Sequence, residues 1–533
     1  QGALRLMAVA TQSGRVGSAE RTLIVRSPVV LQGAAPRVVC PGDTFSASLK
    51  VENLDLPEGA YTLTVTDGPT FTGTLAQGAS VMHTLELPAR TTLEAQVTLG
   101  DCTRSLRLPI TVREPIPEQQ ITTFALCTGE PPEGADLVNE AAVAQTALDW
   151  LSRYPFDCTE QLVAQGLPYL FRKDALAKEQ VAWVTQQMMT RKIEAGAFLA
   201  FPESGMIHDG GTLMAALFLA EQERLPWRTQ RIMREVAGLR EQEYRGRAAF
   251  ATWVLALEGD DAAIGCAEDL INARDDDDAA FVAACALIRL GYAKEGGERA
   301  TEFLSSGTRP QSLLPGVMDE QASLGFATFL TVRCGLTEAL PADWLAALVT
   351  GQQRTTQGCA WTACALEALK ATGTSADLRL IRTTAQRSAV QSGQAIHVTR
   401  EVVDASGQPI TTLRHGDLAW VKITFTLPRA VEDVALRDLL PGGLDYEDAN
   451  LATRESVTLP DWAAEATPFD VTRKLPGEVR FFGDCDQGTT LVVYPVRAVS
   501  CGVYQLPATL VEAMYDPELT GACAPETPLT IVP

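Results

Sequence analysis

Cys158 and Gln161 are the two side chains of this sequence whose types and spacing suggest a specific chemistry. They lie in the segment YPFDCTEQLVAQGLPYLF, residues 154–171, where the apolar spacing predicts that a helix begins near the cysteine. A thiol at a helix N-terminus meets free backbone N–H groups and the positive end of the helix dipole, which favour the thiolate. Residues three apart share one helix face. The thiolate is therefore placed to attack the Gln161 carboxamide, expel ammonia and leave a thioester.

A thioester is an activated acyl group, so it lasts only where water is excluded. Tyr154 and Phe156 precede the cysteine and are candidates for aromatic cover. The alternative is that Cys158 is an ordinary half-buried thiol and Gln161 a surface amide. The chemistry of these residues leaves both interpretations open.

Length, composition and charge narrow the class of protein. A chain of 533 residues exceeds the roughly 250 residues at which single cores stop growing, so several domains are expected. The composition is globular, with 46% hydrophobic and 21% charged residues. A net charge of −22 repels polyphosphate, so nucleic acid is not an expected partner. The sequence has no GxSxG, HExxH, P-loop or dinucleotide fingerprint, and no cofactor is expected.

The cysteine content favours an exported protein. Twelve cysteines exceed what a reducing cytosol usually requires. Candidate disulfides join Cys40 to Cys102 and two of Cys485, Cys501 and Cys523, with Cys501 and Cys523 as the preferred pair. The sequence has no apolar run near ~18 residues and no signal-peptide pattern at its start. We therefore expect a truncated or processed chain whose targeting signal lay upstream.

The hydrophobic pattern changes twice along the chain. Up to about residue 125 it alternates with period two between Gly, Pro, Asp and Asn breaks, which is typical of a β-sandwich. Over 137–373 apolar residues recur every three or four positions, and four predicted helices end on glycine, which indicates a ring or solenoid of helix pairs. Alternation then returns and predicts a second sandwich. The fold class is multidomain, with β-domains on both sides of an all-helical domain.

Two further clusters have simpler interpretations than a metal site. The acidic run 275–278 lies at a predicted helix start, where carboxylates complement the dipole, and we interpret it as a helix cap. Cys359 and Cys364 lack other ligands at zinc spacing, so no metal is expected. His208 lies in a glycine-bounded loop, and we expect it to be solvated.

The segment that opens the helical region resembles a known motif. Residues 154–161, YPFDCTEQ, resemble the Cys-x-Glu-Gln thioester motif of the α2-macroglobulin and complement family, in particular the bacterial α2-macroglobulins. Thr159 and Glu160 fill the two positions between the cysteine and the glutamine. The stretches GAFLAFPESG, LLPGGLDYEDANL and VEAMYDPELTG resemble later landmarks in the C-terminal half of those proteins.

The resemblance implies macroglobulin-like β-sandwiches flanking an α/α-toroid thioester domain, in which Tyr154 and Met514 shield the bond. Two features depart from the family: the second CUB half looks abbreviated, and GTLMAALF at 211–218 replaces a Trp-Leu-Thr-Ala segment. The implied parts are the end of a preceding macroglobulin-like domain at 1–26, a sandwich at 27–113, a first CUB-like segment at 114–140, the toroid at 141–375, an abbreviated second CUB-like segment at 376–393 and the shielding sandwich at 394–533.

The resemblance also implies a function: a monomeric, non-enzymatic endopeptidase inhibitor whose single-use thioester captures target proteases after bait cleavage. His208 does not match the family histidine that favours hydroxyls, so direct attack by protease lysine amines is expected. The expected cellular location is the periplasm or the cell surface, and any membrane anchor would lie upstream. Two other hypotheses remain: an acyl-transfer enzyme using Cys158 with His208, and a structural surface protein whose motif no longer forms the bond.

Overall fold

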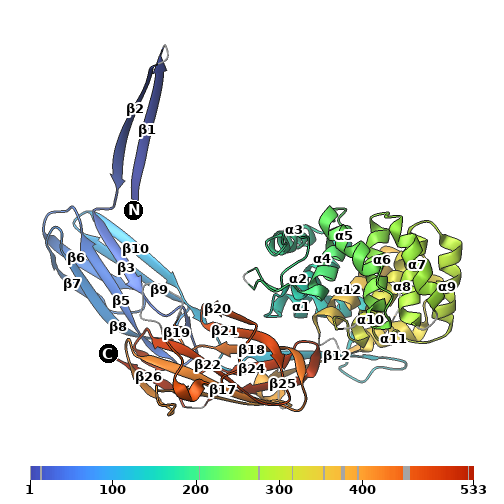
Figure 1. Cartoon of the computed structure of the whole chain (residues 1–533). Coiled ribbons are helices and arrows are strands. Elements are labelled where there is room, and N and C mark those ends of the chain that lie inside the picture. The colour runs from blue at the N-terminus through green and yellow to red at the C-terminus, as the bar shows by residue number, and fades with distance from the viewer. Residues whose placement is uncertain are drawn as a thin grey trace. The chain divides into compact units, whose positions relative to one another are not determined.

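The chain forms two compact units (Figure 1). The β unit comprises residues 1–118, 388–512 and 519–533, and the helical unit comprises 119–387 and 513–518. No helix in the described residues is both long and apolar enough to cross a membrane. The computed structural model describes residues 2–12, 15–202, 204–273, 276–314, 316–351, 355–373, 378–392, 395–447, 457–525 and 527–533.

The first part of the β unit is a sandwich whose strands follow the predicted alternation. Along β5, Phe45, Ala47, Leu49 and Val51 are buried while the residues between them are partly exposed, because successive side chains of a strand point to opposite faces. One sheet has the order β10-β9-β6-β7, and β5 pairs with β3 and β8 in another. The strands are β3 (Val29–Ala34), β4 (Val38–Val39), β5 (Thr44–Asn53), β6 (Gly59–Val65), β7 (Thr70–Leu75), β8 (Ser80–Pro88), β9 (Thr92–Leu99), β10 (Cys102–Pro109) and β11 (Thr111–Val112).

The last part of the chain also folds into sheets, in the orders β15-β17-β22-β19 and β20-β21-β18-β24-β25. These strands are β15 (His397–Val403), β16 (Thr412–Arg414), β17 (Leu418–Leu427), β18 (Val431–Leu439), β19 (Leu444–Tyr446), β20 (Val471–Leu475), β21 (Glu478–Cys485), β22 (Gly488–Ala498), β23 (Gly502–Tyr504), β24 (Thr509–Ala513), β25 (Asp516–Cys523) and β26 (Leu529–Val532).

A shared sheet joins the two ends of the β unit, which the sequence pattern did not predict. Strand β23 pairs antiparallel with β5, with Gly502 opposite Phe45, and this extends the first sandwich by β26 and β16. The Arg113 guanidinium donates to the main-chain carbonyls of Gly477 and Leu440 at 3.1 and 2.9 Å. Residues more than three hundred positions apart therefore belong to one compact unit.

Strands β1 (Gly2–Gln12) and β2 (Arg15–Val25) form a two-stranded sheet of their own. Its apolar side chains are largely exposed: Leu4, Leu6, Met7, Val9 and Val16 are each more than half accessible. A two-stranded hairpin buries too little surface to be stable alone. This agrees with the prediction that 1–26 completes a preceding domain, and that assignment stays a prediction.

The helical unit is a closed ring of paired helices. Within the described residues, the inner helices contact one another in the cyclic order α2-α4-α6-α8-α10-α12 and back to α2, while α1, α3, α5, α7, α9 and α11 pack outside them. The inner helices are α2 (Thr159–Gly166), α4 (Asp209–Ala220), α6 (Arg245–Leu257), α8 (Asp277–Arg289), α10 (Glu320–Arg333) and α12 (Thr356–Ala371). The outer helices are α1 (Glu140–Arg153), α3 (Ala175–Met189), α5 (Trp227–Ala237), α7 (Ala262–Ala273), α9 (Ala293–Ser305) and α11 (Ala342–Thr350).

The inner helices are the ones whose sequences are apolar or small nearly all round, since a helix packed on every side has no polar face. Every residue of α4 except Asp209 is buried, and α12 is buried over most of its length. The glycines after α6, α8, α10 and α12 (Gly259, Gly291, Gly335 and Gly373) all have positive φ, between 68° and 97°. The predicted repeat of helix pairs with left-handed glycine caps is confirmed.

A small sheet stands at the entry and exit of the ring. Its order is β12 (Glu118–Leu126), β14 (Leu380–Ser388) and β13 (Asp136–Val138), so the strands before and after the ring pair with each other. A short helix, α13 (Ala389–Ser392), follows. The sheet occupies the position of the predicted CUB-like segments, whose boundaries stay predictions.

The structure does not form the predicted disulfides: all twelve cysteines lie in described residues, and none of them is in a disulfide bond. Cys102 opens β10, whereas Cys40 lies beside the residue that follows β11, so roughly 36 Å of extended chain separates Cys102 from the neighbour of Cys40. Cys485 and Cys523 lie in one sheet with two strands between them, and at opposite ends of it: Cys485 is opposite Val431 at the start of β18, whereas Cys523 lies by Asp438 near the end of that strand. Cys501 precedes β23 in a different sheet. The expected export stays a prediction.

The contact between α10 and α12 allows a test of the ring. A Cβ at Gly325 would lie 2.7 Å from the Trp361 carbonyl carbon, whereas one at Gly265 on α7 would meet nothing within 4 Å. Both changes to alanine gain about 1 kcal/mol of helix propensity. We expect Gly265→Ala to raise the melting temperature and Gly325→Ala to lower it, because overpacking costs about 1–3 kcal/mol. Equal rises in both variants would contradict the close packing.

Candidate functional site

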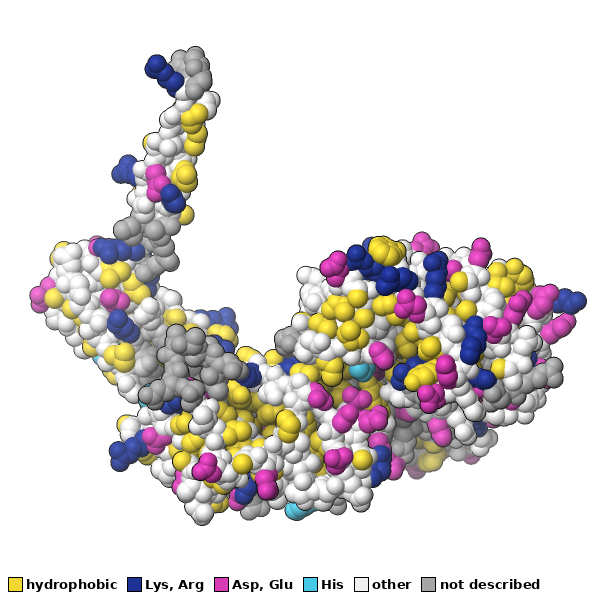
Figure 2. All heavy atoms as spheres, in the orientation of Figure 1, with side chains coloured by type: hydrophobic (Ala, Val, Ile, Leu, Met, Phe, Trp, Pro, Cys, Tyr) yellow, Lys and Arg dark blue, Asp and Glu magenta, His cyan; other side chains and the backbone are white. Residues whose placement is uncertain are grey.

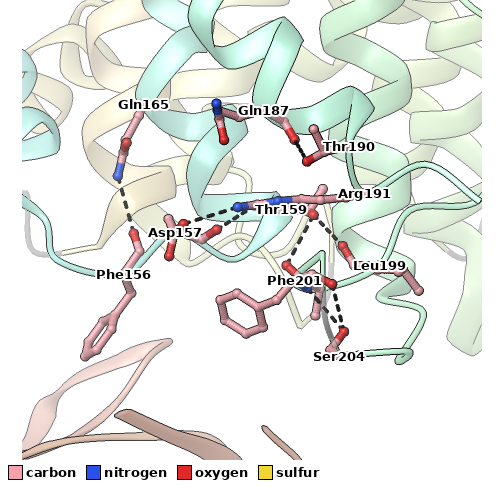
Figure 3. A network of polar contacts seen from close by, with 11 residues as sticks. Phe156, Asp157, Thr159, Gln165, Gln187, Thr190, Arg191, Leu199, Phe201 and Ser204 are labelled. Carbon is pink, nitrogen blue, oxygen red and sulfur yellow. Dashed lines mark hydrogen bonds and ion pairs between the residues drawn. The ribbon is translucent and has the colours of Figure 1, made fainter. Parts of the chain in front are cut away.

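Helix α2 begins directly after Cys158, as predicted. Cys158 is its N-cap residue in an extended backbone conformation, and its side chain is buried. Thr159 fixes the start of the helix: its N–H donates to the Ala200 carbonyl at 2.9 Å, and its hydroxyl donates to the Leu199 carbonyl. Both acceptors lie in the loop before α4. Figure 3 shows Thr159 beside this loop, and its contacts fix the residue that directly follows Cys158.

Arg191 holds the residue before the cysteine. Arg191 is only 2% exposed. Its guanidinium donates to the Asp157 carbonyl at 2.5 Å and to the Asp157 carboxylate at 3.2 Å. Figure 3 shows these hydrogen bonds, which join Arg191, just after α3, to Asp157. The Gln165 amide donates to the Phe156 carbonyl at 3.3 Å. Two side chains, Arg191 and Gln165, therefore hold the backbone of the two residues that precede Cys158.

Gln161 is the most unusual side chain of the site. It is completely buried, and neither its Nε2 nor its Oε1 has a hydrogen-bond partner in the described part of the chain. Leaving a buried polar group unsatisfied costs about 1–3 kcal/mol, and a carboxamide has two such groups. The interpretation of Gln161 as a surface amide is wrong. Loss of the amide nitrogen in an acyl bond to Cys158 would remove the buried donor.

Glu160, between these residues, is a buried point of contact for three side chains. Its Oε1 accepts from Gln357 Nε2 at 2.5 Å. Its Oε2 lies 2.9 Å from the Tyr515 hydroxyl and 3.6 Å from Cys158 Sγ. Gln357 lies in the first turn of α12, and Tyr515 lies in the turn between β24 and β25, within the segment 513–518 that belongs to the helical unit. Complete burial raises the pKa of the Glu160 carboxyl above its usual value.

The predicted cover residues occupy different environments. Phe156 is 2% exposed, and its ring meets Tyr154 edge-on with centroids 5.5 Å apart. Tyr154 is partly buried and stacks on Trp150 at 4.9 Å. Met514 is 8% exposed in the same turn as Tyr515. The structure brings Met514 into the unit that contains Cys158; its role as a shield stays a prediction.

His208 differs from its expected solvated state. It caps α4, its Nδ1 accepts from the Gly211 N–H at 2.8 Å, and it is only partly exposed. Burial lowers the pKa of His208, while the nearby Glu160 charge acts to raise it. The glycine-bounded loop ends at the start of α4, where Gly211 lies close to both the His208 ring and Thr159.

The acidic run forms the expected helix cap. Asp276 is the N-cap of α8 and accepts from the Ala279 N–H at 2.9 Å; Asp275 lies outside the described residues. Among the described residues, no group of three or more His, Cys, Asp and Glu side chains is placed to hold a metal ion. On the face of the helical unit drawn in Figure 2, acidic and basic side chains are interspersed.

Sequence reasoning missed three residues that complete the site: Gln357, Tyr515 and Arg191. Arg191 and Gln357 are buried polar side chains at the end of one predicted helix and the start of another, and nothing local marks them as partners of the motif. Tyr515 directly follows Met514, so the same stretch VEAMYDP contained the signal. An aromatic hydroxyl beside a predicted cover residue was the available hint.

Comparison with known proteins addresses the family. The family model of the bacterial alpha-2-macroglobulin MG10 domain matches residues 396–518. Alpha-2-macroglobulin of Xylella fastidiosa (strain 9a5c) is 23% identical across 100% of this chain and 40% of its own length. That of Escherichia coli (strain K12) is 28% identical across 28% of this chain and 10% of its own length. The chain thus spans 40% of the length of the Xylella relative.

Solved structures have the same fold. Salmonella alpha-2-macroglobulin reacted with methylamine matches 100% of this chain and 42% of that one, with TM-score 0.80 and 20% identity. Native alpha-2-macroglobulin of Escherichia coli, spanning MG7 to the C-terminus, matches 95% of this chain and 99% of that one, with TM-score 0.76 and 18% identity. The chain is therefore a multidomain protein of macroglobulin domains and a helical ring. Residues 396–518 match the bacterial alpha-2-macroglobulin MG10 domain, and the whole chain is similar to the C-terminal portion of bacterial alpha-2-macroglobulins.

Proposed function

We propose that this chain carries the reactive portion of a broad-spectrum protease inhibitor, in which Cys158 and Gln161 form an internal thioester. The bond would form when Sγ attacks the side-chain carbonyl carbon and ammonia leaves. After a protease cleaves a bait segment elsewhere in the protein, the last β-domain would move and carry Met514 and Tyr515 away. A lysine amine of the protease would then be acylated at Gln161, and Cys158 would be released as a thiol.

The observation that carries the proposal is the pair formed by a buried cysteine at the start of α2 and a fully buried carboxamide without partners in the described residues, one helical turn later. A carboxamide that remained an amide would be a costly choice here. A site built to store an acyl group needs burial without competing donors or water. The Salmonella relative was reacted with methylamine, a small amine nucleophile of the kind that opens such bonds.

The environment of His208 supports amines over hydroxyls as acceptors. Because Nδ1 accepts from the Gly211 N–H, the neutral ring carries its proton on Nε2. Neither nitrogen then offers a free lone pair for taking up an acyl group. Burial lowers the pKa of this histidine and so favours the neutral ring. The same engagement weakens the alternative of a cysteine enzyme, which needs an imidazole free to act as a base.

The bond itself can be detected directly. We expect the intact mass of freshly prepared protein to be lower than the sequence mass by one ammonia. Methylamine should restore mass as a single adduct, mapped by peptide sequencing to Gln161, with a new thiol at Cys158. A mass equal to the sequence mass under gentle preparation would support the structural-protein alternative instead. Continued turnover of small amine and glutamyl substrates would support the enzyme.

The expected compartment is part of the same proposal. Capture of foreign proteases requires that the protein meets them, so we propose a periplasmic or surface location and a monomeric state. What supports this location is the similarity to bacterial alpha-2-macroglobulins.

A further inference from the structure

The thiol of Cys158 lies against an acceptor for its proton. Its Sγ donates to Glu160 Oε2 at 3.6 Å, within the range of a hydrogen bond that involves sulfur. Both residues are buried, Glu160 completely. The first geometric requirement of general base catalysis is a base within hydrogen-bond reach of the proton that it removes. The contact between Cys158 and Glu160 meets this requirement.

The other contacts of the Glu160 carboxyl also bring donors to its oxygens. Gln357 Nε2 lies 2.5 Å from Oε1 and 3.5 Å from the Glu160 main-chain carbonyl, so the amide NH₂ faces this residue. The Tyr515 hydroxyl donates to Oε2 at 2.9 Å. A carboxylate only accepts hydrogen bonds, whereas a carboxylic acid also donates one. Three donors directed at the two oxygens therefore suit the carboxylate, which is the form that acts as a base.

The conversion of an amide into a thioester requires such a group. The thiol must lose a proton to attack, and the amide nitrogen must gain one to leave, because an amide anion is a far stronger base than a thiolate. Gln161 Nε2 has no hydrogen-bond partner in the described part of the chain, so no such partner holds this nitrogen in place. A base beside the sulfur that then protonates the nitrogen satisfies both needs with a single proton.

We propose that Glu160 is the catalytic base of thioester formation and carries the Cys158 thiol proton to the Gln161 nitrogen. The inference rests on the thioester proposed above and adds the residue that makes the bond. The Glu160 carboxylate takes the proton from Sγ as the sulfur attacks the Gln161 carbonyl carbon. The C–N bond then breaks with its electron pair on nitrogen, and Glu160 returns the proton to give ammonia. The carboxylate is regenerated, and no other reactant is required.

The surroundings of Glu160 adjust its strength as a base. Complete burial raises the pKa of its carboxyl, while the hydrogen bonds from Gln357, Tyr515 and Cys158 act to lower it. A carboxylate whose pKa is raised takes a proton more readily than an exposed one. His208 also faces Glu160, and burial lowers the pKa of this ring, which favours its neutral form.

The test follows the bond as it forms. The full chain, with Cys158 as a thiol and Gln161 as an amide, is dissolved in urea and diluted into buffer at neutral pH. Mass spectrometry follows the loss of one ammonia, and circular dichroism follows the return of the helices. We expect Glu160→Gln to refold like the parent and to lose ammonia about 100-fold more slowly, the typical contribution of a general base. The new amide oxygen can still accept from Tyr515.

The pH dependence distinguishes a base from a structural contact. In the parent, the rate should fall as pH decreases through the raised pKa of Glu160, because the carboxylate is lost, and it should be level above that pKa. In Glu160→Gln the remaining reaction requires free thiolate, so its rate should rise about tenfold per pH unit below the pKa of the Cys158 thiol. Parallel profiles in the two proteins would overturn the inference. So would a parent rate in Glu160→Gln.

Glu160→Asp gives a second readout if Glu160→Gln does not refold. It keeps a carboxylate on a shorter side chain, so we expect slower formation with the level pH profile of the parent. A rate that climbs about tenfold per pH unit through the neutral range in the parent would contradict the role of Glu160. If the refolded parent never loses ammonia, the proposed thioester itself fails.

Discussion

Asp438→Ala is expected to lower the free energy of unfolding of the β unit by about 3–5 kcal/mol, the typical cost of removing one partner from a buried ion pair. Asp438 and Arg400 are both completely buried, with Arg400 Nε 3.0 Å from the carboxylate. The hydroxyls of Tyr494 and Thr509 also donate to Asp438. Asp438, on β18, therefore links strands of both sheets of the last sandwich. Its replacement by alanine leaves the buried Arg400 charge without its carboxylate partner.

The measurement is a shift of the urea midpoint, with hydrogen exchange of peptides from 431–439 and 488–498 to locate the change. An exposed pair provides the matched control: Arg309 and Asp343 lie 3.1 Å apart with about half of each side chain accessible. We expect Asp343→Ala to cost less than about 1 kcal/mol. Similar losses in both variants would show that burial of the Asp438 pair does not govern its contribution.

Cys158→Ala is expected to abolish methylamine incorporation at Gln161 completely. Without the sulfur the carbonyl carbon stays an unactivated amide, and the buried carboxamide keeps its two unsatisfied groups. The variant should therefore have the unmodified mass at Gln161 and retain the ring fold. It should also be less stable than thioester-containing protein by about 1–3 kcal/mol.

Cys359→Ala is the matched control, since Cys359 is a fully buried thiol of the same ring on α12. It should lose a comparable amount of packing but keep the adduct at Gln161. If Cys158→Ala still incorporated methylamine at Gln161, the amide would be activated by another group. The thioester proposal would then be abandoned.

Local pattern predicted much of the helical unit. Four glycine-ended helices in a row indicated paired helices, and they are α6, α8, α10 and α12 of the inner ring. The helix start at Cys158 was also predictable, because a helix boundary depends on neighbours in the chain. The closure of the ring through α2 and α12 was not, since it depends on which faces meet after folding.

The disulfide prediction shows where pattern fails. Cys40 and Cys102 lie in segments with the same alternating signature, yet the length of β10 and β11 separates them. Alternation determines which face of a sheet a residue occupies and says nothing about its height along the strand or its neighbours in other sheets. The pairing of β23 with β5 was missed for the same reason.

The candidate site divides along the same line. Cys158, Glu160 and Gln161 are neighbours in sequence, so their types and one-turn spacing were sufficient to propose the chemistry. Gln357 and Tyr515 come from positions about two hundred and more than three hundred and fifty residues further on, and only the folded chain brings them to the Glu160 carboxyl. Burial, and with it the raised pKa of that acid, likewise arises from packing. Chain neighbours specify which groups can react, whereas long-range contacts set their protonation and their protection from water.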